Sequence, residues 1–211
     1  MLVRDNRSSK LGVIYCLHQH KQFCADTNTP TDTELTISNY SRSITVPVKY
    51  ARDGFSQFID AAFAVFEDVS DITKLGFRAD KLFTGISDPN IGDPLTMFGI
   101  GSQGNLNFAR VTNLQEQLEF PLLSNEKMIY NGVLLGPMSA EDPASAFCYP
   151  GDSGAIWYND KFEAVGLHVA GYYAEAEHKI LPYMLKISDV LNALDVSIVT
   201  PDEFSNLVPT E

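Results

Sequence analysis

The sequence predicts an all-β protein, folded as a barrel or a sandwich. Short segments rich in β-branched and aromatic residues recur along the chain, with Gly, Pro, Asn and Asp between them. These segments are residues 11–17, 34–38, 43–50, 60–66, 94–100, 105–111, 126–135, 154–158 and 162–171. Only residues 186–196 carry a clear helical pattern, with Ser188 as the expected N-cap.

Length and composition allow a well-packed core. The chain has 211 residues, of which 45% are hydrophobic and 20% are charged. Residues 87–94 collect turn-forming residues between two strand-rich halves and are the expected linker. The last residues, 200–211, are expected to be loose.

Charge excludes two classes of partner. The formal net charge of −12 argues against nucleic acid, which needs clustered Lys and Arg, and against an anionic membrane surface. No apolar run is long enough to span a bilayer, and the N-terminus lacks the pattern of a signal peptide, so we expect a cytoplasmic protein. The three cysteines, Cys16, Cys24 and Cys148, are expected to be reduced thiols, with a Cys16–Cys24 bridge as the alternative.

The motif "PGDSG" at 150–154 is the first candidate for chemistry. Two glycines flank an Asp-Ser pair and let the backbone bend sharply, which can expose Ser153 as a nucleophile. An ordinary polar turn is the alternative, because the same residue types dominate turns.

A serine nucleophile needs a base and an orienting carboxylate. The chain has four histidines, at positions 18, 20, 168 and 178. Asp60 leads directly into the apolar segment "DAAFAVF", where a carboxylate is costly unless it is paired. We therefore predict that Asp60 is the orienting residue, with a solvated strand-end Asp as the alternative.

The order His, Asp and then "GDSG" resembles the chymotrypsin/trypsin-like serine proteases. "DAAFAVF", "AVGLHVAGYY" (164–173) and "NIGDPLTMFGIGSQGNLNFARV" (90–111) are similar to the Asp motif, a strand of the substrate cleft and the opening of the second barrel in that family. The resemblance implies two six-stranded antiparallel β-barrels and a C-terminal helix. Residues 1–88 would carry His and Asp, and residues 89–211 would carry Ser and the helix.

The histidine departs from the family pattern. That pattern is Leu-Thr-x-x-His at the end of a strand, and counting from Leu17 leaves His20 one residue short and puts His18 where Thr is expected. We predict His20 as the base, with His18 or no functional base as alternatives. The family usually has more residues before its histidine, so the first barrel is expected to be incomplete.

The mechanism that the resemblance implies is acyl transfer. Ser153 would attack a peptide carbonyl, His20 would take its proton, and Asp60 would orient the imidazole. The backbone N–H groups of Gly151 and Ser153 would bind the oxyanion. No cofactor and no metal are needed, and the partner is a peptide or protein substrate.

The resemblance also implies a substrate site. A peptide would add as a strand along Val169, Ala170 and Gly171. The pocket floor would lie near Phe147 and Cys148, where no acidic residue stands, so cleavage after Lys or Arg is not expected.

Three further residues have expected roles. His168, in "GLHVAG", resembles the position at which Glu- and Gln-specific members bind the substrate side chain, and a buried structural His is the alternative. Trp157 is expected in the core. Asp152 is expected to find its partners locally, without cleavage of a precursor.

Two other classes of protein compete with an active serine endopeptidase. A catalytically inactive relative could use the same scaffold to bind peptides, and an unrelated β-domain could carry "GDSG" by chance. An α/β-hydrolase is disfavoured because no G-x-S-x-G sequence surrounds Ser153 and because strands do not alternate with helices.

Overall fold

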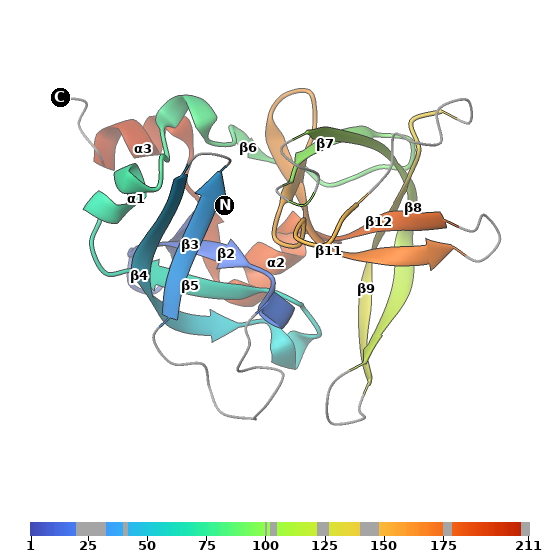
Figure 1. The fold of residues 1–211 in the computed structure, drawn as a ribbon, viewed down its shortest axis with the longest axis horizontal. Helices are drawn as coiled ribbons and strands as arrows, with labels where there is room; N and C mark the ends of the chain where they lie inside the picture. Colours follow the sequence, from blue (N-terminus) through green and yellow to red (C-terminus); the bar gives the residue numbers. More distant parts are fainter. Residues whose placement is uncertain are drawn as a thin grey trace.

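Two β-sheets lie side by side in the computed structural model and form the two halves of the molecule (Figure 1). The structure describes residues 1–19, 33–39, 42–99, 101, 105–121, 127–139, 148–174 and 179–207. This arrangement confirms the predicted all-β fold with two chymotrypsin-like halves.

The N-terminal sheet has six strands, and each pair of neighbouring strands is antiparallel. In spatial order these are β13 (Val196–Ile198), β1 (Leu2–Asp5), β2 (Leu11–Tyr15), β5 (Ala62–Phe66), β4 (Arg42–Asp53) and β3 (Thr33–Asn39). Every residue of β5 is buried, and so are four of the five in β2. Continuous apolar runs of this kind are typical of strands that are covered on both faces.

The C-terminal sheet closes on itself. Its strands are β10 (Ile156–Tyr158), β7 (Pro94–Phe98), β8 (Leu106–Pro121), β9 (Lys127–Gly136), β12 (Lys179–Lys186), β11 (Glu163–Ala174) and β6 (Gly85–Ile86). Because β10 also pairs with β11, six of these strands form a closed ring, and β6 adds to β11 in parallel.

The C-terminal segment crosses back to the N-terminal half (Figure 1). β13 pairs with β1 and is the sixth strand of the N-terminal sheet. The sequence analysis had not identified β1. α3 (Pro201–Leu207) follows, with Phe204 buried against the core of that half. The first sheet thus takes its strands from residues 2–66 and 196–198, and the second takes its strands from residues 85–186. The prediction of a loose tail is wrong for residues 201–207.

α2 (Ile187–Leu194) is the predicted helix and lies between the two halves (Figure 1). It buries the side that carries Ile187, Val190, Leu191 and Leu194. It begins at Ile187, so Ser188 is not the N-cap. Instead the Ser188 hydroxyl donates to Asp88, 2.7 Å away.

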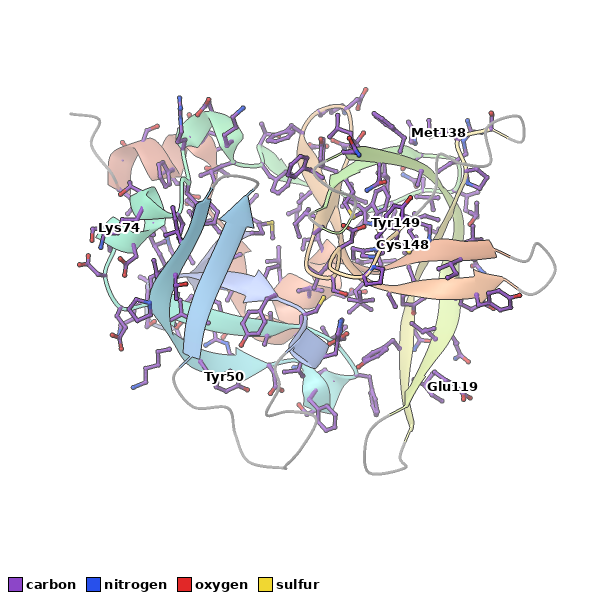
Figure 2. All side chains as sticks on the ribbon, viewed as in Figure 1. Tyr50, Lys74, Glu119, Met138, Cys148 and Tyr149 are labelled. Atoms are coloured by element: carbon purple, nitrogen blue, oxygen red, sulfur yellow. The ribbon has the colours of Figure 1, made fainter. Side chains whose placement is uncertain are left out.

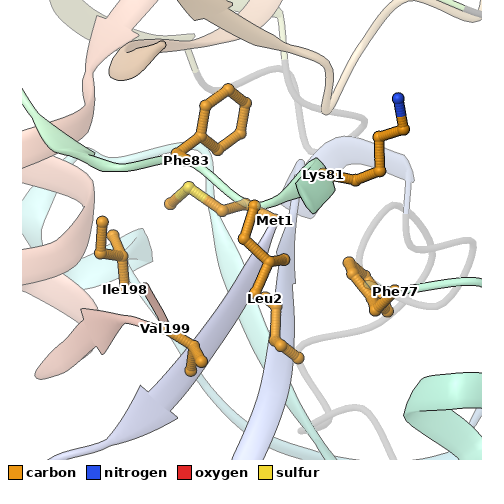
Figure 3. Close-up of a pocket in the computed structure, with 8 residues that line it drawn as sticks. Met1, Leu2, Phe77, Lys81, Phe83, Ile198 and Val199 are labelled. Atoms are coloured by element: carbon orange, nitrogen blue, oxygen red, sulfur yellow. The ribbon is translucent and has the colours of Figure 1, made fainter. Parts of the chain in front are cut away.

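Short helical segments complete the chain and lie outside the strands. They are η1 (Leu17–Gln19), η2 (Phe55–Gln57), α1 (Ser70–Lys74) and η3 (Ala79–Lys81). Figure 3 shows a small apolar cavity of about 40 Å³ where β1 and β13 meet η3, lined by residues that include Leu2, Phe83 and Val199. None of the residues that line it belongs to the site described below.

Arg52, on β4, connects the N-terminal sheet to the end of α2. Its guanidinium forms an ion pair with Asp5 and donates to the backbone carbonyls of Leu194 and Asp195, the latter at 2.9 Å. It also lies 5.1 Å from the centre of the Phe63 ring. Arg52 and Ser8 hold the pKa of Asp5 down at about 2 against the opposing effect of burial.

Two further findings bear on the sequence analysis. Cys16 and Cys148 carry free thiols, and Cys24 lies outside the described residues. In the part of the chain that the structure describes, no helix has the length and apolar character that crossing a membrane requires.

Candidate active site

Asp60 lies two residues before β5, in the loop that connects β4 to β5. Backbone hydrogen bonds from Gly54 to Ala61 (2.9 Å) and from Ile59 to Gly54 (3.0 Å) close this loop. The Asp60 side chain is 2% exposed, and its Oδ1 accepts a hydrogen bond from the backbone N–H of His18 at 2.9 Å. The carboxylate is therefore paired, as burial of a charge requires.

His18 stands between Asp60 and Ser153. β2 runs antiparallel to β5 with Tyr15 opposite Ala62, so the residues that follow β2 lie beside those that precede β5. The Nδ1 atom of His18 is 2.5 Å from Asp60 Oδ2, and its Nε2 atom is 3.1 Å from Ser153 Oγ.

This geometry favours His18 over His20 as the candidate base. His18 occupies the position that the sequence analysis assigned to His20, which lies outside the described residues. The error came from the strand boundary, because β2 ends at Tyr15 and not at Leu17. In the family pattern an aliphatic residue lies four positions before the histidine. Ile14 lies four positions before His18, and Tyr15 stands in place of the threonine. That spacing was present in the sequence and was missed.

Ser153 is held on a turn that pairs with β11. Gly151 and Gly154 have φ angles of +101° and +90°, which side chains rarely adopt, so both glycines are required by the backbone. The N–H of Gly154 donates to the His168 carbonyl, and the N–H of His168 donates to the Ala155 carbonyl, each at 2.9 Å. The motif is thus a glycine-dependent turn that is hydrogen-bonded to a strand.

Asp152 finds its partner locally, as predicted. Its side chain is fully buried, and its Oδ2 accepts the backbone N–H of Tyr149 at 2.9 Å. The Asp152 N–H donates in return to the Tyr149 carbonyl at 3.0 Å. These bonds stabilise the turn that precedes Ser153.

The predicted substrate residues lie along β11 beside the serine. Ser153 Oγ is 3.4 Å from the Val169 carbonyl, and a bulge separates His168 from Ala170. A Cβ atom added to Gly171 would lie 3.1 Å from Cys148 Sγ, so Cys148 packs against this strand, next to Tyr149 (Figure 2). Phe147 lies outside the described residues.

His168 is 2% exposed and hydrogen-bonded to Trp157. The Trp157 Nε1–H donates to His168 Nδ1 at 3.4 Å, and Trp157 is fully buried, as predicted. Burial lowers the pKa of His168 to about 4, with His18 adding to the effect and Asp152 opposing it. The imidazole is neutral at pH 7, and because Trp157 can only donate, the His168 proton lies on Nε2.

One further residue touches the site and was not predicted to do so. Cys16 directly follows β2 and is fully buried, and its thiol donates to the His168 carbonyl at 3.2 Å. Burial and the nearby Asp60 carboxylate raise the pKa of this thiol. Its Sγ, a ring nitrogen of His18 and an Asp60 oxygen lie within 4.8 Å of one another, a group that could hold a metal ion.

Comparison with solved structures defines the class of the fold as that of the chymotrypsin-like serine proteases. The Nocardiopsis protease NAPase is similar over 93% of this chain and 88% of its own, with a TM-score of 0.57 and 16% identity. Cellulomonas bogoriensis chymotrypsin matches over 90% and 86%, with a TM-score of 0.56 and 14% identity.

A third similar structure is a glutamic acid specific serine protease that uses a histidine triad in substrate binding. It matches over 93% of this chain and 90% of its own, with a TM-score of 0.54 and 12% identity. No protein-family model matches the sequence, and no curated protein matches it significantly. At these identities the likeness establishes the fold.

Proposed function

We propose that the protein is a serine endopeptidase with Ser153 as nucleophile, His18 as base and Asp60 as orienting carboxylate. One observation carries the proposal: the His18 imidazole lies within hydrogen-bonding distance of both other residues, through its two different nitrogens. A polar turn without chemistry has no need of this arrangement.

The proposed reaction follows the two hydrogen bonds of His18. The Ser153 hydroxyl donates to Nε2, which takes the proton as Oγ attacks the peptide carbonyl. The Nδ1–H donates to Asp60, whose buried carboxylate stabilises the imidazolium that forms. His18 then returns the proton to the leaving amine, and water releases the acyl group by the same steps in reverse.

The oxyanion would be bound by the backbone N–H groups of Gly151 and Ser153. The positive φ of Gly151 supports this assignment, because it turns the peptide at the point where the pocket is needed. One such donor is commonly worth about 3 kcal/mol of the barrier. The peptide would lie along Val169, Ala170 and Gly171 as an added strand.

His168 is the residue proposed to bind the substrate side chain and to determine specificity. Its Nε2–H can donate one hydrogen bond to an amide or carboxylate oxygen, which suits Gln or Glu. The likeness to a glutamic acid specific protease supports this direction. A peptide library should therefore give a preference for Gln or Glu that disappears in His168→Ala. A preference for large apolar residues in both proteins would remove the assignment.

Labelling with a fluorophosphonate probe tests the catalytic proposal. Mass spectrometry should find the label on Ser153 in the wild type, and Ser153→Ala and His18→Ala should lose it. His20→Ala is the matched control, a histidine two residues away in the sequence, and should keep it. If folded wild-type protein is not labelled, the chain is an inactive relative that binds peptides. Loss of the label in His20→Ala but not in His18→Ala would show that His20 is the base, as the sequence analysis predicted.

A further inference from the structure

Three different metal ligands meet at the candidate triad, two of them from the triad itself. A thiol, an imidazole and a carboxylate are contributed by Cys16, His18 and Asp60, and their ligand atoms lie within 4.8 Å of one another. They come from the end of β2 and the start of β5, which pair in the sheet. This combination of sulfur, nitrogen and oxygen donors is one that Zn²⁺ binds in tetrahedral sites.

We propose that Cys16, His18 and Asp60 form a zinc site that switches the triad off. The inhibitory part of the proposal rests on the proposed function, whereas the binding part stands on the geometry alone. Zinc would bind to the Asp60 side of the His18 ring and leave the Ser153 side uncoordinated.

Zinc binding would require only a small movement of the ligand atoms. Zinc bonds of about 2.0 to 2.3 Å place tetrahedral ligand atoms about 3.3 to 3.6 Å apart. The 2.5 Å contact between His18 and Asp60 would therefore open by about 1 Å. His18 can make this movement because its side chain is 21% exposed, whereas Cys16 and Asp60 are held in the core. Water would take the fourth position.

Proton balance explains why the metal inhibits. Cys16 loses its thiol proton to solvent on binding. The proton of neutral His18 moves from Nδ1 to Nε2, because the metal takes the Nδ1 lone pair. Nε2 then carries a hydrogen and can no longer accept the proton of Ser153. The bond that orients the ring through Asp60 is lost at the same time.

The donor set also predicts which metals act. Thiolate and imidazole favour Zn²⁺ and Co²⁺, whereas Mg²⁺ and Ca²⁺ prefer oxygen ligands. Zinc should therefore inhibit in the presence of excess Mg²⁺ or Ca²⁺. Cys148 supplies a matched control thiol, since it packs against Gly171 and is not part of the cluster.

Cobalt absorption tests the site without turnover. Full-length Ser153→Ala protein titrated with Co²⁺ should develop thiolate-to-cobalt charge-transfer absorption and the intense visible bands of a tetrahedral ion. Adding Cys16→Ala should remove the charge-transfer band and weaken binding by at least about 100-fold, more than the loss of an outer-shell partner costs. Adding Cys148→Ser should leave both unchanged. No charge-transfer band, or a band lost only with Cys148, would overturn the proposal.

Inhibition is measured separately on protein with Ser153 intact. Zinc should slow fluorophosphonate labelling, a chelator should restore it, and Cys16→Ala should resist zinc when compared with its own metal-free rate. A protein that binds cobalt through Cys16 but is never labelled would refute the proposed peptidase and keep the zinc site. A protein that is labelled on Ser153 but gives no cobalt band would refute the zinc site and keep the proposed peptidase.

A second measurement covers the case in which Cys16→Ala does not fold. X-ray absorption at the zinc edge, on wild-type protein with one equivalent of Zn²⁺, should show one sulfur ligand and the remainder nitrogen or oxygen. A shell of nitrogen and oxygen alone would refute the involvement of Cys16.

Discussion

Replacement of His168 by Gln should remove a pH-dependent part of the stability. His168 is buried as the neutral imidazole, and its pKa falls from 6.5 to about 4 on folding. The unfolded chain therefore binds more protons than the folded one between these two values, and stability is lost as the pH falls through this range. The full loss is on the order of 3 kcal/mol, of which about 2 kcal/mol falls between pH 7 and pH 5.

Urea unfolding of both proteins at pH 7, 6 and 5 measures this effect. Gln can still accept the Trp157 hydrogen bond through its amide oxygen, so the variant tests the charge and not the contact. The stability of the wild type should fall more steeply with acidification than that of His168→Gln, and the other titrating groups cancel in the difference. Parallel curves for the two proteins would show that His168 does not stay neutral in the folded state.

Three other predictions follow from single contacts. Arg52→Ala should lower the free energy of unfolding by about 3 kcal/mol or more, because it leaves the buried Asp5 carboxylate without its charged partner, while the exposed control Arg78→Ala should change it by less than about 1 kcal/mol in the same urea titration. Asp60→Asn should reduce kcat for a peptide substrate about 10⁴-fold, and an unchanged kcat in folded protein would contradict the role of this carboxylate. Phe204→Ala should cost about 3 to 5 kcal/mol if α3 packs as described, and a loss under about 1 kcal/mol would show that the helix adds little.

Much of the fold could be predicted from local patterns, and the exceptions have physical causes. β1 and β13 have only four and three residues, too few to show a strand pattern, and β13 pairs with β1 across most of the chain. β12 was not among the predicted segments either. α3 is different, because its signal was present. Thr200 precedes Pro201, and its backbone N–H and hydroxyl bond to Glu203 Oε2 at 3.0 and 3.2 Å, a pattern typical of a helix start.

The candidate site shows the same division. Ser153 and Asp60 could be found because each stands in an unusual local context, a double-glycine turn and an acid at the head of an apolar strand. The choice between the two nearby histidines depended on where β2 ends, and the spacing from Ile14 to His18 that favours His18 was missed because the strand was expected to reach Leu17. Cys16 was missed because a buried thiol has no local signature that separates a core residue from a ligand.

The candidate triad is assembled across the boundary between the two sheets, so its geometry depends on how they pack. His18 and Asp60 lie next to β2 and β5 of the N-terminal sheet, and Ser153 lies on the turn that precedes β10 of the other. One core cluster joins the two, with Phe63 from the first sheet against residues that include Leu167 from the second and Val190 from α2. A catalytic group displaced by about 1 Å can lose 100-fold in rate. This shared cluster sets the distance between His18 Nε2 and Ser153 Oγ. We therefore expect substitutions in the cluster to affect catalytic activity more than they affect the stability of the fold.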